Sequence, residues 1–216
     1  MAIFRLPGVY RPQGDTRLLC EALKEAGVRG ARVLDVCTGT GRVALSAALH
    51  GAARVTAVDV SWRAVMSART NALMRGVNIE VRRGDLFKPV KGEKFDVITI
   101  NPPYVPNLNG EPGRHGRERA WDAGPRGRAT LDRVCEQAPR QLGPGGLLLM
   151  VHSALCGVET TLDALRTSGM KASVLLRHEE PFGPVMRGRA DELASHGLIR
   201  HGQDREELVV IRAERA

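Results

Sequence analysis

The stretch from residue 31 to residue 51, ARVLDVCTGTGRVALSAALHG, decides the fold. Its first seven residues form a short, valine-rich apolar run, which is typical of a buried strand. Gly39 and Gly41 then interrupt the run, and the alanine-rich segment that follows, up to Gly51, is typical of a helix. The sequence therefore predicts a strand, a tight turn and a helix in direct succession.

The alternation of strands and helices continues on both sides of this stretch. Residues 15–26 carry apolar side chains at helical spacing, with Asp15 or Thr16 as the N-cap. Further strands are predicted at 54–60, 78–85, 94–104, 147–153, 171–179 and 206–214, and further helices at about 62–75, 128–142 and 157–168. This alternation specifies the α/β class, with an open, mostly parallel sheet covered by helices on both faces.

The length of 216 residues predicts one domain, 1–216. Within it, residues 105–127 form a loop rich in glycine, proline and arginine, and residues 181–204 resist interpretation. No apolar run approaches the roughly 18 residues that span a membrane, and no signal-peptide pattern opens the chain, so we expect a cytoplasmic protein without a membrane partner. The four cysteines are scattered and form no CxxC pair, which argues against a metal site or a disulfide framework.

The net charge of +8 favours an anionic partner such as RNA, a ribosome or an acidic protein surface. An arginine-rich composition without any such partner explains the charge equally well. Four histidines, His152, His178, His196 and His201, are expected at the surface or in turns, and none is assigned as a base.

Carboxylates follow or end three successive predicted strands, where ligands of α/β sheets bind. Asp35 precedes the glycine turn of Thr38, Gly39 and Gly41, and a carboxylate there would repel a pyrophosphate but suits the ammonium and sulfonium of S-adenosylmethionine. A dinucleotide remains the alternative, because its folds use a similar glycine turn.

The next two carboxylates complete the predicted cofactor site. Asp59, followed by Val60, lies 18 residues beyond Gly41 and is placed to hold two ribose hydroxyls. Asp85 can accept from the adenine amino group while Leu86 or Phe87 packs on the ring. Each aspartate alone could equally be a helix cap or a turn residue.

The fourth predicted strand ends in Asn101-Pro102-Pro103-Tyr104, where two prolines force the chain out of the sheet. The nitrogen of an amide or an aromatic amine is a poor nucleophile because its lone pair is delocalised. Acceptors for both of its N–H bonds, the Asn101 side-chain oxygen and the Pro102 carbonyl, would favour the pyramidal nitrogen of the transition state. Tyr104 can lie against the planar group. The alternative is an ordinary proline turn.

Three stretches resemble the NPPY amino-methyltransferases: VYRPQGDTRLL at 9–19, DVCTGTG at 35–41, and NPPYVP with RERAWDAGPRGRATLDR at 117–133. Within that family the chain is similar to the HemK-type group of release-factor glutamine N5-methyltransferases, in its short branch made of the catalytic domain alone. The resemblance implies a Rossmann-like class I methyltransferase with a seven-stranded, mostly parallel sheet and an antiparallel C-terminal strand. It also implies S-adenosylmethionine as cofactor and a release-factor glutamine as acceptor. Asp15 and Thr16 become cofactor-proximal candidates, and Asn101 is expected to contact the cofactor as well as the acceptor.

The acceptor stays open at this level. Adenine N6 or another nucleic-acid amine is an alternative that the net charge supports. Four arginines near the turn at 101–104, which we call the acceptor turn, support it as well: Arg114, Arg117, Arg119 and Arg126. A protein lysine or a small metabolite, with residues 181–204 as a lid, is a further alternative. Short-branch relatives also suggest a small activator subunit as a partner.

Overall fold

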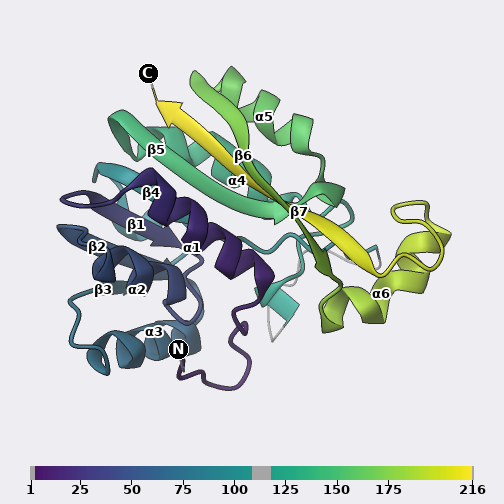
Figure 1. The fold of residues 1–216 in the computed structure, drawn as a ribbon, viewed down its shortest axis with the longest axis horizontal. Helices are drawn as coiled ribbons and strands as arrows, with labels where there is room; N and C mark the ends of the chain where they lie inside the picture. The colour runs from purple at the N-terminus through teal and green to yellow at the C-terminus, as the bar shows by residue number, and fades with distance from the viewer. Residues whose placement is uncertain (1–2, 109–117, 216) are drawn as a thin grey trace.

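A computed structural model describes residues 3–108 and 118–215. Seven strands form one sheet in the order β3-β2-β1-β4-β5-β7-β6 (Figure 1). The strands are β1 (Arg32–Val36), β2 (Arg54–Asp59), β3 (Glu80–Arg83), β4 (Phe95–Ile100), β5 (Leu142–Ser153), β6 (Met170–Pro181) and β7 (Arg205–Arg215). The α-helices are α1 (Gly14–Ala26), α2 (Arg42–Leu49), α3 (Trp62–Leu73), α4 (Ala129–Gln137), α5 (Val158–Thr167) and α6 (Pro184–Ser195).

The pairing confirms the predicted fold class. β1 lies between β2 and β4 and is parallel to both, with Val33 opposite Val55 on one side and Val97 on the other. β3 and β5 extend the parallel set at either end. β7 runs antiparallel to both of its neighbours, β5 and β6. The resemblance implied this antiparallel direction, and the structure adds that the last strand of the chain is inserted between two earlier ones.

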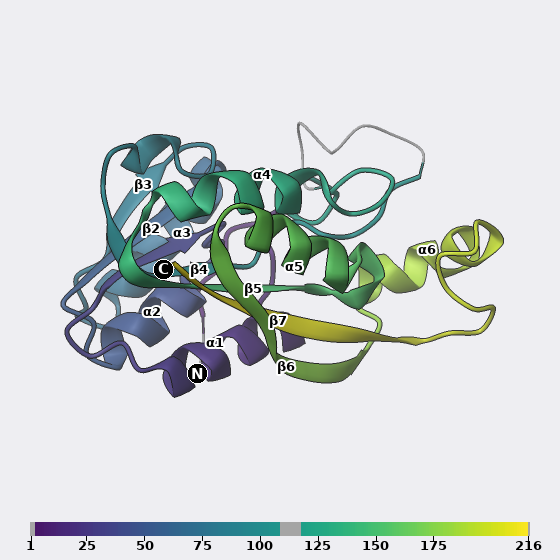
Figure 2. The ribbon, with the colours of Figure 1, turned by 90° about the horizontal axis from the view of Figure 1, so that it is seen from above.

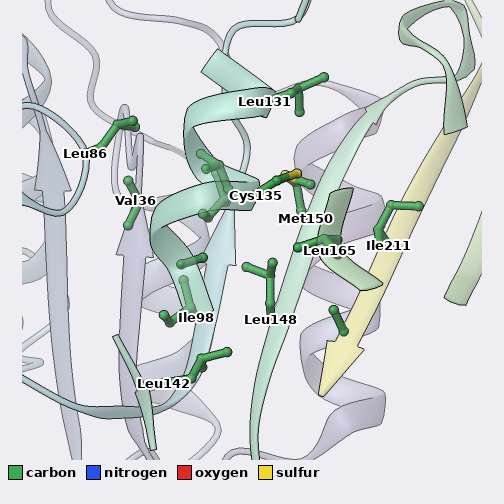
Figure 3. Close-up of a cluster of buried hydrophobic side chains, with 14 of the residues drawn as sticks. Val36, Leu86, Ile98, Leu131, Cys135, Leu142, Leu148, Met150, Leu165 and Ile211 are labelled. Carbon is green, nitrogen blue, oxygen red and sulfur yellow. The ribbon is translucent and has the colours of Figure 1, made fainter. Parts of the chain in front are cut away.

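Helices cover both faces of the sheet because alternate strand residues point to opposite sides. On one face α4 and α5 pack on the sheet, and Figure 3 shows Leu131 and Cys135 of α4 with Ile98, Leu148 and Met150 of the strands. On the other face α1, α2 and α3 pack against the intervening strand residues, among them Leu149. Seen from above, α4 and α5 lie on one side of β5, and α1 and α2 lie on the other (Figure 2).

Several predicted boundaries differ from the structure. The third strand, predicted at 78–85, spans only Glu80–Arg83, so Asp85 lies two residues beyond its end. α4 stops at Gln137 rather than near 142, because Pro139 cannot donate a helical hydrogen bond, and a short 3₁₀ turn follows. β5 begins at Leu142, so the GPGG segment at 143–146 belongs to the strand, with Gly145 at φ 68°. The fourth predicted strand stops at Ile100, one residue before Asn101.

The segment 181–204, which the sequence left without an interpretation, contains α6. The helix begins with Pro184 at a position where the missing N–H costs nothing. Phe182, Met186, Leu193 and Ile199 bury their side chains in a small apolar cluster of their own with Val105. Among the described residues, no helix is long and apolar enough to cross a membrane.

Candidate active site

A cavity of about 620 Å³ opens at the carboxyl ends of the parallel strands. It is lined by nearly all of the residues that the sequence singled out: Asp15, Thr16, Asp35, Thr38, Gly39, Asp59, Val60, Asp85, Leu86, Asn101, Pro102 and Tyr104. Gly41 is not among the lining residues. It is the N-cap of α2 and has a left-handed φ of 79°. A Cβ there would lie 3.0 Å from the Cβ of Ala68 in α3. The tight spacing of the two helices accounts for this glycine, and its contact with the cofactor stays a prediction.

Asp35 holds the glycine turn in place from inside the protein. One carboxylate oxygen accepts hydrogen bonds from the Thr38 hydroxyl (2.5 Å) and the Ala44 N–H (3.2 Å), and the other accepts from the Thr99 hydroxyl (2.8 Å). Burial raises the pKa of Asp35 to about 6, although these three hydrogen bonds oppose the rise. The side chain thus ties β1 to β4 and α2, and a contact with a cationic ligand stays a prediction.

Asp59 joins the glycine turn to the start of α3. Its Oδ2 accepts from the Gly39 N–H and its Oδ1 from the Ser61 N–H, both at 2.9 Å. Ser61 in turn caps α3 by accepting from the Ala64 N–H (3.4 Å). These bonds fix the carboxylate at the cavity wall, at the end of β2.

Asp85 is paired with two cations that the sequence interpretation missed. Its Oδ2 lies 2.7 Å from Arg133 of α4 and 3.2 Å from Lys88. Burial alone would raise the pKa of Asp85, but the hydrogen bonds from Arg133 and Lys88 outweigh it and lower the pKa below its usual value. Arg133 lies 48 residues from Asp85, a separation at which no local pattern indicates a contact. Leu86, buried beside it, takes the left-handed φ of 48°.

The acceptor turn is anchored by α1 through one carboxylate. Tyr10 and Tyr104 both donate their hydroxyls to Oδ2 of Asp15, at 2.8 and 3.2 Å. Oδ1 of Asp15 accepts from the backbone N–H and the hydroxyl of Thr16, and Thr16 Oγ1 accepts from Asn101 Nδ2 at 3.4 Å. Since the amide nitrogen of Asn101 is turned to Thr16, its oxygen is the end available to accept a hydrogen bond.

Burial decides the protonation state of Tyr104 and of its neighbour Tyr10. Burial raises the pKa of Tyr104 well above its ordinary value, and the nearby Asp15 carboxylate adds to the effect. Tyr104 is therefore a neutral phenol at any physiological pH, able to donate to Asp15 while its ring faces the cavity. Tyr10, which the sequence interpretation did not single out, shares this environment, and its pKa is also raised by burial and by Asp15.

Backbone packing behind Tyr104 fixes the turn from the other side. The Cys156 thiol donates to the Tyr104 carbonyl at 3.1 Å. A Cβ on Gly127, whose φ is 68°, would lie 2.3 Å from the same carbonyl oxygen, so only glycine fits there. Of the four arginines predicted near the turn, Arg126 is exposed, and Arg114, Arg117 and the side chain of Arg119 lie outside the described residues.

One expectation about histidines is wrong. His152 is fully buried in β5 rather than lying at the surface or in a turn. Its Nδ1 lies 2.8 Å from the Ser153 carbonyl oxygen, and burial lowers its pKa to about 4, so the ring is neutral.

The sheet order and the cavity at the carboxyl ends of its parallel strands define a Rossmann-like class I methyltransferase. Residues 1–112 match the family model described as "Methyltransferase small domain". A Methanocaldococcus jannaschii protein named as a protein N5-glutamine methyltransferase is 37% identical over 180 residues, covering 83% of this chain and 90% of that protein. The release factor glutamine methyltransferase of Geobacter sulfurreducens is 32% identical over 189 residues, covering 85% of this chain and 66% of its own length.

Among solved structures, the E. cuniculi Mtq2-Trm112 complex, described as responsible for the methylation of the eRF1 translation termination factor, has the same fold. Its matching chain gives a TM-score of 0.68 at 23% identity, over 97% of this chain and 99% of that one. The chain therefore belongs to the methyltransferase small domain family and, within it, to the HemK-type group of S-adenosylmethionine-dependent N-methyltransferases.

Proposed function

We propose that this protein methylates the side-chain nitrogen of a glutamine in a translation release factor, with S-adenosylmethionine as the methyl donor. The observation that carries the proposal is a single cavity that is lined both by the acceptor turn and by the predicted cofactor residues: Asn101, Pro102, Tyr104, Asp59 and Asp85. The names of the relatives supply the acceptor class.

The cavity residues fit this cofactor better than a dinucleotide. Asp35 lines the cavity beside the glycine turn, where a dinucleotide would place its pyrophosphate, and a carboxylate there disfavours that group. Asp59 would hold the ribose hydroxyls, Asp85 and Leu86 the adenine, and the turn at Thr38 and Gly39 the methionine end. When bound, the cofactor supplies a methyl group on a cationic sulfur. Asp15 and Thr16 border this space from α1.

The acceptor turn supplies the rest of the reaction. Asn101 Oδ1 and the Pro102 carbonyl accept hydrogen bonds from the two N–H groups of the incoming amide. These hydrogen bonds strengthen as the nitrogen becomes pyramidal. The Tyr104 ring lies against the planar amide and sets which face it presents. No buried base is needed, since the proton of the methylated nitrogen can leave to solvent after transfer.

The test is transfer of a labelled methyl group from S-adenosylmethionine to purified release factors. We expect label on one glutamine, lost when that glutamine is replaced by asparagine, whose amide is one methylene shorter. Label on RNA or DNA, on lysine or on a small amine would identify one of the other acceptors and overturn the glutamine assignment. Labelling in a cytoplasmic extract, followed by fractionation, tests the expected cytoplasmic location at the same time.

A small activator subunit is the second partner we propose. Trp62, Met66 and Leu73 lie along one side of α3 with exposed fractions of 53%, 45% and 82%, and apolar surface of this kind marks interaction sites. The relative from E. cuniculi was solved with a second subunit. Co-purification of a small protein with the wild type, lost in a Trp62→Ser, Leu73→Ser variant, supports the proposal; full activity of the isolated chain contradicts it.

A further inference from the structure

The segment 181–204 is built into the wall of the acceptor site. Beyond the acceptor turn, the chain forms a small ladder in which Val105 N–H donates to the Trp121 carbonyl (2.8 Å) and Ala123 N–H donates to the Val105 carbonyl (3.1 Å). Asn107 N–H continues it with a bond to the Gly124 carbonyl (3.0 Å). This ladder, 105–107 with 121–124, continues directly from Tyr104, so its position sets the position of the turn.

One side chain of α6 spans both strands of the ladder. Arg189 Nη1 donates to the Pro106 carbonyl at 2.9 Å and lies 2.5 Å from Oδ1 of Asp122. The Asp122 side chain has no exposed surface and the Arg189 side chain only 19%. The other oxygen of Asp122 accepts from Asn107 Nδ2 at 2.9 Å, which adds a second tie between the two strands. Burying such a pair is costly unless further hydrogen bonds offset the desolvation, and here the bonds to Asn107 and to the Pro106 carbonyl do so.

Apolar packing places the same helix against the cavity wall. Val105, Tyr104 and Trp121 line the cavity and also pack in the cluster formed by α6 and its flanking residues. Figure 1 shows α6 projecting beyond the main body of the sheet, between the ends of β6 and β7. The helix therefore contacts the acceptor side of the cavity and not the glycine turn that holds the cofactor end.

We propose that Arg189 and Asp122 are positioning residues for methyl transfer, and that the segment 181–204 sets the geometry of the acceptor pocket while leaving the cofactor pocket unchanged. The catalytic consequence rests on the proposed function, whereas the bracing of the ladder does not. An arginine suits this task because its guanidinium is a permanent cation whose Nη1 is within reach of both oxygens, the Pro106 carbonyl and the Asp122 carboxylate.

The test combines kinetics with hydrogen exchange of single amides. In Arg189→Ala, we expect kcat/KM for the release factor to fall about tenfold or more, because small displacements of the acceptor are costly. The dissociation constant of S-adenosylmethionine should stay within about twofold of wild type, since the glycine turn is untouched. The amides of Val105, Asn107 and Ala123 should exchange about tenfold faster or more, with β1 unchanged.

The matched control is Arg200→Ala, which removes an exposed arginine of the same segment and should change none of these values. If Arg189→Ala fails to fold, the double variant R189M/D122N serves instead, because it removes both charges while an asparagine oxygen can still accept from Asn107. Unchanged exchange at the three amides, or a loss of cofactor affinity equal to the loss in kcat/KM, would overturn the inference. If the wild type methylates no acceptor, the proposed function fails. The exchange data then still show whether Arg189 and Asp122 stabilise the ladder.

Discussion

At the scale of single residues, the acceptor turn depends on contacts that decide how each polar group is presented. The Asn101 amide is oriented by a hydroxyl from α1, and the Tyr104 phenol is held by a carboxylate 89 residues away in sequence. Replacing Asp15 would therefore disturb both Asn101 and Tyr104, the two side chains that we propose contact the acceptor, although Asp15 itself does not contact it.

The first prediction separates the two ends of the cavity. Asn101→Ala should lower kcat by about 10² or more, because it removes an acceptor needed mainly in the transition state, while cofactor affinity stays near wild type. Asp59→Ala should weaken cofactor binding first. Calorimetry with S-adenosylmethionine and steady-state kinetics provide both numbers. Equal losses of kcat and cofactor affinity in Asn101→Ala would contradict its role.

The second prediction concerns His152, whose buried ring has a pKa of about 4 in the folded protein against an ordinary value near 6.5. Between these values the unfolded chain binds a proton that the folded protein does not, so stability falls as pH drops through this window. The slope is about 1.4 kcal/mol of unfolding free energy per pH unit.

Asp35 has the opposite sign, because its raised folded pKa makes the protein lose stability as pH rises from about 3.8 to about 6. The two slopes oppose each other in the wild type. Urea unfolding of His152→Leu and wild type at matched pH values isolates the histidine. As pH falls from 6.5 to 4, the unfolding free energy of the wild type should decrease relative to that of the variant. A difference independent of pH would mean that the ring has the same pKa in the folded protein as in the unfolded chain, which would contradict the prediction.

Sequence reasoning found the residues that end strands and missed those brought in from elsewhere. Asp59, Asp85 and Asn101 could be predicted because the carboxyl ends of parallel strands meet at one edge. Arg133 could not, since its contact with Asp85 depends on how α4 lies on the sheet. Tyr10 was missed although its bond to Asp15 spans only five residues in sequence, because no periodic pattern marks such a contact. The burial of His152 follows from its place in a central strand, and the LLLMVHS run that predicted the strand carried that signal.

At the scale of elements, the contact between α2 and α3 depends on one glycine. Gly41→Ala should lower the unfolding free energy by about 1–3 kcal/mol from the left-handed φ alone, and by more because the new methyl would meet Ala68 at 3.0 Å. Gly27→Ala is the matched control, with φ 71° and no atom within 4 Å of the added Cβ. A loss no greater than that of the control would show that the two helices can separate freely.

Most elements could be predicted because their apolar patterns are regular, and two could not for identifiable reasons. α6 buries only one sparse set of apolar residues against a loop, so its pattern is weak. The GPGG segment resembles a turn, yet pairing of Leu142 with Phe95 draws it into β5. Tertiary contacts override local preference in both cases.

At the scale of the whole molecule, helices cover both faces of the sheet, and the cavity lies at its carboxyl edge, where we propose that cofactor and acceptor meet. S-adenosylmethionine at about 100 times its dissociation constant should stabilise the fold by about 2.7 kcal/mol. For a chain of this length the unfolding midpoint should rise by about 5–10 °C.

The control ligand for that melting experiment is NAD, which also contains adenine and ribose but carries a pyrophosphate. It should produce no shift, because the Asp35 carboxylate lies by the glycine turn, where the pyrophosphate would have to bind. Asp59→Ala should reduce the shift seen with S-adenosylmethionine. A larger shift with NAD than with S-adenosylmethionine would restore the dinucleotide alternative.

The placement of β7 between β5 and β6 has a consequence for synthesis on the ribosome. Until residues 205–215 have emerged, β5 has no partner on one side, and the interior apolar residues of a nascent chain stay open to solvent and to other chains. A premature stop codon ahead of residue 205 would therefore leave β6 without its partner strand and β5 with an open edge, which makes the product a target for chaperones and proteases.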